Sequence, residues 1–343
     1  MLMTSTVNKA APRTPGRSWR WLARVLWGLV ILFLALCSIG AIYQAVGATR
    51  DRAAFPPPGQ LVDVGGHRLH LYCTGEATAG RPTVILETLS GGIGAYWGWV
   101  QPEIAKQTRV CSYDRAGRAW SEPASEPLSL AQTVRDLHTL LANAGVDGPY
   151  VLVGHSIGGI YVRKYAADYP NEVVGMVLVD ASHPEQFARY PELWEANESF
   201  LRLSALFPWL ARVGLFRLYF ATGGTLDMGE LPPTALGVAK AVWSTPAYFA
   251  SQRAEGMAGP AIFADGRELG DLGDLPLVVV SAGAQQPAMW AGLQAELATL
   301  STNAQHITVD QATHSSLAFN PQDAQATSAA ILQVVEAAAG HPR

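Results

Sequence analysis

The chain has 343 residues, of which 49% are hydrophobic and 15% are charged, and its formal net charge is −4. This composition is too apolar for a disordered chain, and the length allows one large buried core. The slightly negative charge provides no positive field that would attract a phosphate backbone, so we expect no nucleic-acid partner.

A basic segment and a long uncharged run open the chain. Residues 1–24 contain five Lys or Arg and no acidic residue, and residues 25–48 contain no charged residue. The uncharged run is long enough to span a bilayer, and a basic flank is typical of the cytoplasmic side. We therefore predict a basic cytoplasmic segment at 1–24 and a transmembrane anchor at 25–48, with the rest of the chain outside the cytoplasm.

The alternative for this region is a signal peptide that is cleaved near Ala48, which would release the chain as a secreted protein. The apolar core of a signal peptide is usually only ~7–15 residues long, so the anchor is the preferred interpretation. In both cases the folded part of the chain leaves the cytoplasm.

A Pro-rich linker is predicted at 49–60, because Pro56, Pro57 and Pro58 cannot continue a helix. The folded domain should occupy 61–343 and open with two strands around a glycine turn at 65–66. Further apolar runs that predict strands lie at 83–87, 109–114, 150–156, 173–180, 275–283 and 305–310.

Helical patterns separate most of these strands. After Ser129, which is a suitable N-cap, apolar residues recur at helical spacing until Gly145. This β-α-β rhythm and the continuous Val, Ile and Leu runs predict an α/β fold in which a mostly parallel sheet has helices on both faces. The segment 182–274 has many aromatic residues and no clear strand, so we predict that it forms a helical lid inserted in the sheet fold.

Ser156 is the candidate nucleophile. It lies between Gly154 and Gly158, directly after an apolar strand and directly before a helix, which is the strand–turn–helix context of the G-x-S-x-G motif. The glycines allow a turn so tight that side chains at their positions would collide with neighbouring backbone. A serine that only capped the helix would not need both glycines.

A serine hydroxyl needs a base, and histidine has a pKa suited to this task. Of the eight histidines, His314 follows the last predicted strand and precedes the final helix. This places it at the carboxyl edge of the sheet, where Ser156 also lies and where ligand chemistry gathers in open α/β sheets. We therefore predict His314 as the general base.

Five motifs carry a resemblance to a known family: LETLSGGIGAYWGWVQPEIA, VCSYDRAGRAWSE, VLVGHSIGG, VLVDASHPEQ and ATHSSL. Over residues 61–338 the chain resembles the serine hydrolase branch, esterase- or lipase-like, of the α/β-hydrolase fold superfamily. The resemblance implies an eight-stranded, mainly parallel sheet, a lid after strand six and catalytic residues in the order Ser, acid, His. It also implies that Ser156 is the nucleophile, that His314 is the base, and that the backbone N–H groups of Ile157 and Leu89 form the oxyanion hole.

The catalytic acid is where the chain departs from the family's usual pattern. The stretch after the seventh predicted strand, SAGAQQPAMW, contains no Asp or Glu. Some members carry the acid after the sixth strand, where this chain has Asp180, so we predict that Asp180 orients His314 and stabilises its cation. Asp310 and Glu87 remain alternatives.

The resemblance also implies a position for two of the cysteines. It sets the second and fourth strands side by side, so Cys73 and Cys111 could form a disulfide, a bond that persists outside the cytoplasm. The alternative is that both are buried free thiols.

The predicted reaction is hydrolysis of a small ester-type molecule through an acyl-enzyme on Ser156, without a metal or an organic cofactor. The aromatic lid indicates an apolar portion in that molecule. The alternatives are an acyltransferase of the same fold and a catalytically silent member that uses the pocket for binding.

Overall fold

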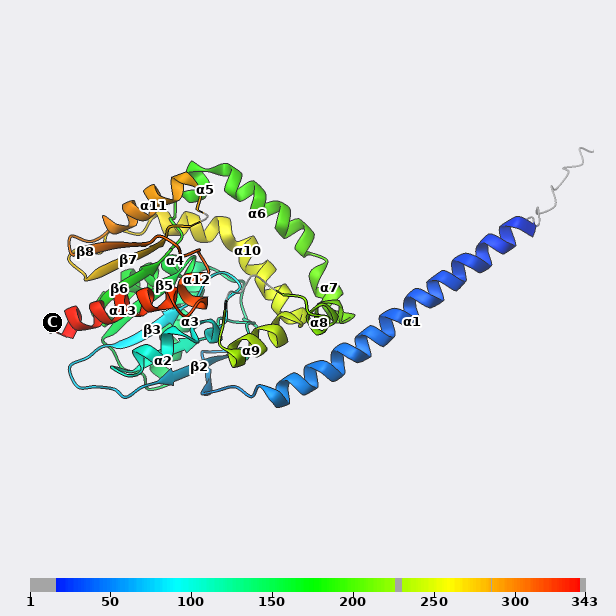
Figure 1. Cartoon of the computed structure of the whole chain (residues 1–343), viewed down its shortest axis with the longest axis horizontal. Helices are drawn as coiled ribbons and strands as arrows, with labels where there is room; N and C mark the ends of the chain where they lie inside the picture. Colours follow the sequence, from blue (N-terminus) through cyan, green and yellow to red (C-terminus); the bar gives the residue numbers. More distant parts are fainter. Residues whose placement is uncertain (1–16, 226–229, 285, 340–343) are drawn as a thin grey trace, which may run out of the picture.

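The computed structural model describes residues 17–225, 230–284 and 286–339. It consists of an α/β body and one long helix that projects away from this body (Figure 1). Residues 1–16 of the predicted basic segment lie outside the described residues.

One sheet of eight strands forms the centre of the body, in the order β1-β2-β4-β3-β5-β6-β7-β8. The strands are β1 (Gln60–Asp63), β2 (Arg68–Thr74), β3 (Thr83–Glu87), β4 (Val110–Tyr113), β5 (Tyr150–His155), β6 (Val173–Val179), β7 (Leu277–Ala282) and β8 (Ala304–Val309). The pairs β1–β2 and β2–β4 are antiparallel, and all other neighbours are parallel. The predicted eight-stranded, mostly parallel sheet is therefore confirmed.

Helices cover both faces of this sheet. Those of the body are α2 (Val100–Ile104), α3 (Leu130–Asn143), α4 (Gly158–Asp168), α11 (Ala288–Ala298), α12 (Ser316–Phe319) and α13 (Asp323–Ala339), with the 3-10 turns η1 (Gly94–Trp97) and η2 (Pro170–Glu172). Residues of α3 and α4 pack on one face, and residues of α2 and α13 pack on the other. The central strands are consequently buried on both sides, which explains their continuous Val, Ile and Leu runs.

The helix predicted after Ser129 is α3. The Ser129 Oγ accepts a hydrogen bond from the backbone N–H of Gln132 at 3.2 Å and so caps the first turn. Gly145 follows the helix at a φ of 64°, where a glycine has no steric penalty. Between these ends, leucines and valines at helical spacing form the buried face.

A purely helical segment, residues 186–267, connects β6 with β7 in the described part of the chain, and we call it the helical insertion. It comprises α5 (Gln186–Arg189), α6 (Pro191–Ser204), α7 (Phe207–Arg212), α8 (Leu215–Ala221), α9 (Pro233–Trp243) and α10 (Pro246–Arg267). Its position matches the lid that was predicted at 182–274. Its function as a lid stays a prediction.

The projecting helix α1 (Arg17–Ala54) is long and apolar enough to cross a membrane. It also corrects the predicted start of the linker, because residues 49–54 are helical rather than extended. No Gly or Pro interrupts residues 49–55, and the N–H of Phe55 still donates to the Asp51 carbonyl at 2.8 Å. The helix ends where Pro56 lacks the next donor and disfavours a helical backbone at Phe55.

A disulfide joins Cys73 of β2 to Cys111 of β4. The two residues face each other in the antiparallel register, and their Cα atoms are 4.0 Å apart. This is the pair implied by the family's strand order.

Candidate active site

Ser156 occupies a strained turn between β5 and α4. Its φ is 58°, a left-handed value that is uncommon for residues other than glycine. A Cβ at Gly154 would lie 2.6 Å from the Gly158 carbonyl oxygen, and a Cβ at Gly158 would lie 2.9 Å from the carbonyl oxygens of Glu87 and Thr88. Gly154 thus allows β5 to turn tightly into α4, and Gly158 allows the turn to fit against the end of β3, so both glycines are needed, as predicted from the motif.

Asp180 follows directly after β6, and its side chain is fully buried. The Oδ1 atom accepts hydrogen bonds from the backbone N–H of Ala282 at 3.1 Å and from Trp290 Nε1 at 2.8 Å. The Oδ2 atom accepts from Gln286 Nε2 at 3.0 Å. Burial raises the pKa of the Asp180 carboxyl, but the hydrogen bond and charge of His314, with these donors, outweigh burial and leave it below its usual value.

His314 lies in the short loop between β8 and α12, and its Nδ1 is 2.6 Å from Asp180 Oδ2. The carboxylate therefore holds the proton on Nδ1 and leaves Nε2 as the nitrogen that can accept a proton. The side chain of His314 is 37% exposed, so this nitrogen is not sealed from solvent.

His155, the residue before the candidate nucleophile, links the Ser156 turn to the His314 loop by a hydrogen bond. Its Nε2 donates to the His314 carbonyl at 2.9 Å, and the two ring centroids are 4.9 Å apart. Burial, together with the neighbouring His314, lowers the pKa of His155 to about 3, so its ring is neutral and can serve as this donor. No role for His155 was predicted from the sequence.

The structure thus places Ser156, Asp180 and His314 after the carboxyl ends of β5, β6 and β8, at the same edge of the sheet. No hydrogen bond joins the Ser156 hydroxyl to His314 within the described residues. Such contacts are often long in unliganded enzymes and tighten when substrate binds. The two alternative acids are elsewhere: Asp310 is exposed and makes no ion pair with His314, and Glu87 is buried in a different cluster.

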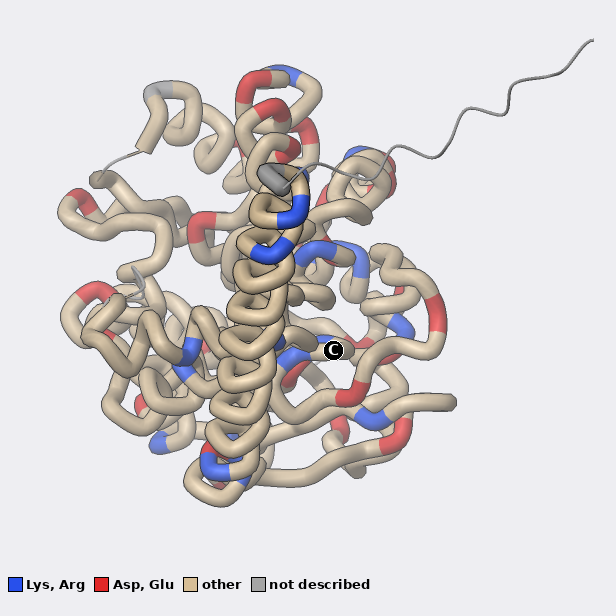
Figure 2. The backbone as a smooth tube through the Cα atoms, turned by 90° about the vertical axis from the view of Figure 1, so that its right-hand side faces the viewer, with Lys and Arg blue, Asp and Glu red and all other residues tan. Residues whose placement is uncertain are grey.

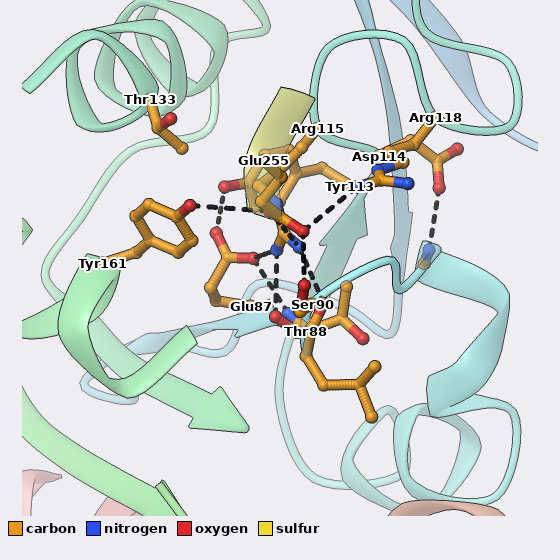
Figure 3. Close-up of polar contacts among 12 residues, drawn as sticks. Glu87, Thr88, Ser90, Tyr113, Asp114, Arg115, Arg118, Thr133, Tyr161 and Glu255 are labelled. Atoms are coloured by element: carbon orange, nitrogen blue, oxygen red, sulfur yellow. Dashed lines mark hydrogen bonds and ion pairs between the residues drawn. The ribbon is translucent and has the colours of Figure 1, made fainter. Parts of the chain in front are cut away.

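That cluster surrounds Arg115 and extends into the helical insertion (Figure 3). The Arg115 guanidinium pairs with Glu87 and lies 2.9 Å from Glu255 of α10. Glu255 also accepts from Arg118 at 3.0 Å, from the Ser90 hydroxyl at 2.9 Å and from the Gly91 N–H at 2.9 Å. Burial raises the pKa of Glu255, but the charges of the two arginines outweigh it and lower the pKa to about 2.

Arg115 also holds the loop that contains the second predicted oxyanion donor. Its guanidinium donates to the Thr88 carbonyl at 2.9 Å and to the Leu89 carbonyl at 2.7 Å. The N–H of a trans peptide points opposite to its carbonyl, so the bond to Thr88 also sets the direction of the Leu89 N–H. Neither this N–H nor that of Ile157 has a hydrogen-bond partner among the residues described.

A cavity of about 610 Å³ lies away from these residues. It is bordered by Phe55 at the end of α1, by Trp97 and Trp120, and by Val238 of α9. Because neither Ser156 nor His314 lines it, this cavity belongs to the base of the projecting helix. In the described part of the chain, no group of three or more His, Cys, Asp or Glu side chains could hold a metal ion.

Comparisons with known proteins agree with this architecture. An uncharacterised protein of Schizosaccharomyces pombe is 29% identical over 299 residues, which are 76% of this chain and 53% of that protein. This chain therefore spans about half the length of that relative.

Two solved structures have the same fold at low sequence identity. A Pseudomonas aeruginosa protein provisionally described as an epoxide hydrolase has a TM-score of 0.65 and 17% identity, covering 82% of this chain and 96% of that one. A protein of Acinetobacter baumannii, provisionally described as a lipase, has a TM-score of 0.61 and 18% identity, covering 86% and 97%. The sequence pattern of the α/β hydrolase fold matches residues 82–321, and the chain therefore belongs to the α/β-hydrolase fold family.

Proposed function

We propose that this protein is a serine hydrolase that cleaves a carboxylic ester, or a related acyl bond, through an acyl-enzyme on Ser156. The observation that carries this proposal is the 2.6 Å contact between His314 Nδ1 and Asp180 Oδ2 beside the strained Ser156 turn. A buried carboxylate, an oriented imidazole and a serine on such a turn are the parts that acyl transfer requires.

In the first step, Ser156 Oγ attacks the carbonyl carbon while His314 Nε2 takes the hydroxyl proton. The carbonyl oxygen becomes an oxyanion. The C–O bond to the leaving alcohol then breaks, and His314 gives the proton to the oxygen of that alcohol. In the second step, water attacks the acyl-enzyme with His314 again as the base, and Ser156 leaves as a hydroxyl. Asp180 stabilises the imidazolium in both steps and stays ionised, in keeping with its lowered pKa.

We assign the oxyanion hole to the N–H groups of Ile157 and Leu89. Their lack of other partners among the described residues supports this assignment, as does the hold of Arg115 on the Thr88–Leu89 peptide. Removing one such donor in another hydrolase costs about 2.7–4 kcal/mol of transition-state stabilisation.

Hydrolysis is favoured over acyl transfer to an alcohol or amine because the His314 side chain is 37% exposed. Water can therefore reach the base that must activate it. The apolar side chains of the helical insertion favour a small substrate with an apolar portion.

We further infer that α1 anchors the chain in a membrane, with the α/β body outside the cytoplasm. Leu26, Phe33 and Ile39 are 65%, 64% and 63% exposed, as are many of their apolar neighbours on α1. So large an apolar surface is unfavourable in water and favourable in a bilayer.

The catalytic proposal is tested on the full chain in detergent with a fluorophosphonate probe and p-nitrophenyl esters of increasing acyl length. We expect labelling and turnover in the wild type and neither in Ser156→Ala. The matched control is Ser315→Ala. Ser315 is next to His314 in the sequence, and its hydroxyl makes no hydrogen bond within the described residues. Equal rates for wild type and Ser156→Ala would refute the proposal, and ester products formed with an added alcohol at the expense of acid would favour an acyltransferase.

A further inference from the structure

One end of the helical insertion carries large apolar side chains that no described part of the chain covers. These side chains come from the end of α6, from the α6–α7 connection, from α7 and from α8, and they are 48–65% exposed. They define what we call the apolar tip: Leu203, Leu206, Trp209, Leu215, Leu218 and Tyr219. Scattered apolar residues are normal on a protein surface, but a contiguous group of this kind marks an interaction site.

Two of the helices that carry the apolar tip, α7 and α8, contact α1 (Figure 1). A Cβ at Gly40 of α1 would lie 2.3 Å from the Val213 carbonyl oxygen, so the helix and the α7–α8 connection touch at backbone distance. Further along α1, Gln44 is buried: its Nε2 donates to the Ser244 carbonyl at 2.8 Å, and its Oε1 accepts from Arg217 at 2.9 Å. These contacts fix the apolar tip at the level of residues 40–44 of α1.

Residues 40–44 belong to the uncharged stretch of α1, which Figure 2 shows between the basic residues at its two ends. A hydrocarbon layer of about 30 Å takes up about 20 helical residues at 1.5 Å each. If this layer begins near Val25, it ends near Gln44, and Gly40 lies inside its outer boundary. The elements that touch Gly40 must then lie at the same depth, at the lipid boundary rather than in water.

The chemistry of the apolar tip fits this depth. Trp209 and Tyr219 are the residue types that are enriched where a bilayer meets water, and the Arg212 guanidinium lies over the Trp209 ring at 4.6 Å. The polar side chain of Gln44, within the uncharged run, takes both its partners from the helical insertion. A buried polar group that is satisfied by protein in this way is what a membrane environment requires.

We propose that the apolar tip inserts into the lipid bilayer beside α1, in the leaflet that faces the α/β body, so that the helical insertion is held at the membrane surface. This proposal rests on the proposed membrane anchorage of α1 and does not depend on the catalytic assignment. A lipid surface is the occupant because the tip is continuous with the surface of the proposed membrane span.

The test uses the full chain in phosphatidylcholine vesicles, with an environment-sensitive fluorophore on one thiol and lipids brominated along the acyl chains as quenchers. Leu206→Cys and Leu218→Cys, each in a Cys37→Ser background, report on the tip, and the wild-type thiol of Cys37 reports on α1. The control is Ala329→Cys in the same background, because residue 329 is exposed on α13, at the opposite end of the molecule from α1 (Figure 1).

We expect brominated lipid to quench the probes at 37, 206 and 218 several-fold more strongly than the probe at 329. Quenching at 37, with the probes at 206 and 218 no more quenched than the one at 329, overturns the proposal and leaves the anchor intact. Absence of quenching at 37 overturns both. Blue-shifted emission at 206 and 218 that bromine does not quench means that protein covers the tip, which also overturns the proposal.

Discussion

Replacing Asp180 by Asn tests the role of the Asp180 carboxylate, because the Asn side chain has nearly the same shape but is not a carboxylate. Asp180 Oδ1 already accepts from the Ala282 N–H and from Trp290 Nε1, so the single oxygen of Asn should stay at that position. The Asn amide nitrogen then occupies the place of Oδ2 and faces His314 Nδ1 at 2.6 Å. A donor at this position forces the proton of the imidazole onto Nε2, the nitrogen that must accept the Ser156 proton.

The expected loss follows from this wrong tautomer. The equivalent Asp to Asn change in another serine hydrolase lowers kcat about 10⁴-fold, which corresponds to about 5 kcal/mol of barrier at 1.36 kcal/mol for each factor of ten. We expect a loss in kcat/KM of about 10³- to 10⁴-fold, with a parallel loss in the rate of fluorophosphonate labelling. The assay is hydrolysis of a p-nitrophenyl ester near neutral pH, with circular dichroism to show that the variant is folded.

Asp310→Asn is the matched control, because Asp310 lies four residues before His314 in the sequence but is exposed and, in the described structure, makes no hydrogen bond or ion pair with it. It should retain wild-type activity. If Asp180→Asn stays within about threefold of wild type, or if Asp310→Asn loses as much, the assignment of the acid is wrong.

The remaining predictions concern the surroundings of the site. The pKa of Glu255 is about 2 in the folded chain against 4.5 for a free glutamate. The ionised Glu255 side chain therefore contributes fully to the stability of the folded chain above about pH 4.5, and this contribution is lost as the pH falls towards 2. The free energy of unfolding should therefore fall more steeply from pH 5 to pH 2 in wild type than in Glu255→Gln, and parallel slopes in urea titrations would refute this. Cys73→Ser with Cys111→Ser opens a loop of 38 residues and should lower the free energy of unfolding by about 4 kcal/mol, whereas an unchanged urea midpoint would contradict it. His155→Ala should lower kcat about fivefold through the lost hydrogen bond of about 1 kcal/mol, and His155→Gln, which keeps a donor, should restore most of it; equal loss in both would mean that only packing matters.

Local sequence was sufficient for features that depend on neighbours along the chain. Each buried strand can be recognised in the sequence by a continuous run of Val, Ile and Leu, because a parallel strand that is covered on both faces has no polar side. The turn at Ser156 is likewise a local property, since Gly154 and Gly158 are needed by backbone atoms within a few residues and by the adjacent strand end. The predicted start of the linker at residue 49 was wrong, because a proline ends only the helix that reaches it and residues 49–54 continue α1.

The family resemblance favoured Asp180 as the acid but left Asp310 and Glu87 open, and only the tertiary structure could choose among the three carboxylates. Asp180 and His314 are 134 residues apart in the sequence, and Arg115 and Glu255 are 140 apart, so no local pattern of residues links the members of either pair. Glu87 is the last residue of β3 and Asp180 directly follows β6, so both lie at the carboxyl end of a strand. Glu87, however, pairs with the buried Arg115, whereas Asp180 pairs with the His314 imidazole. The chain's own pattern therefore determined which elements form and where the nucleophile stands, because those depend on local sterics and burial. The partner of each charge was decided by the tertiary structure, because the order of the strands in the sheet sets which strand ends meet and the packing of α10 brings Glu255 to Arg115.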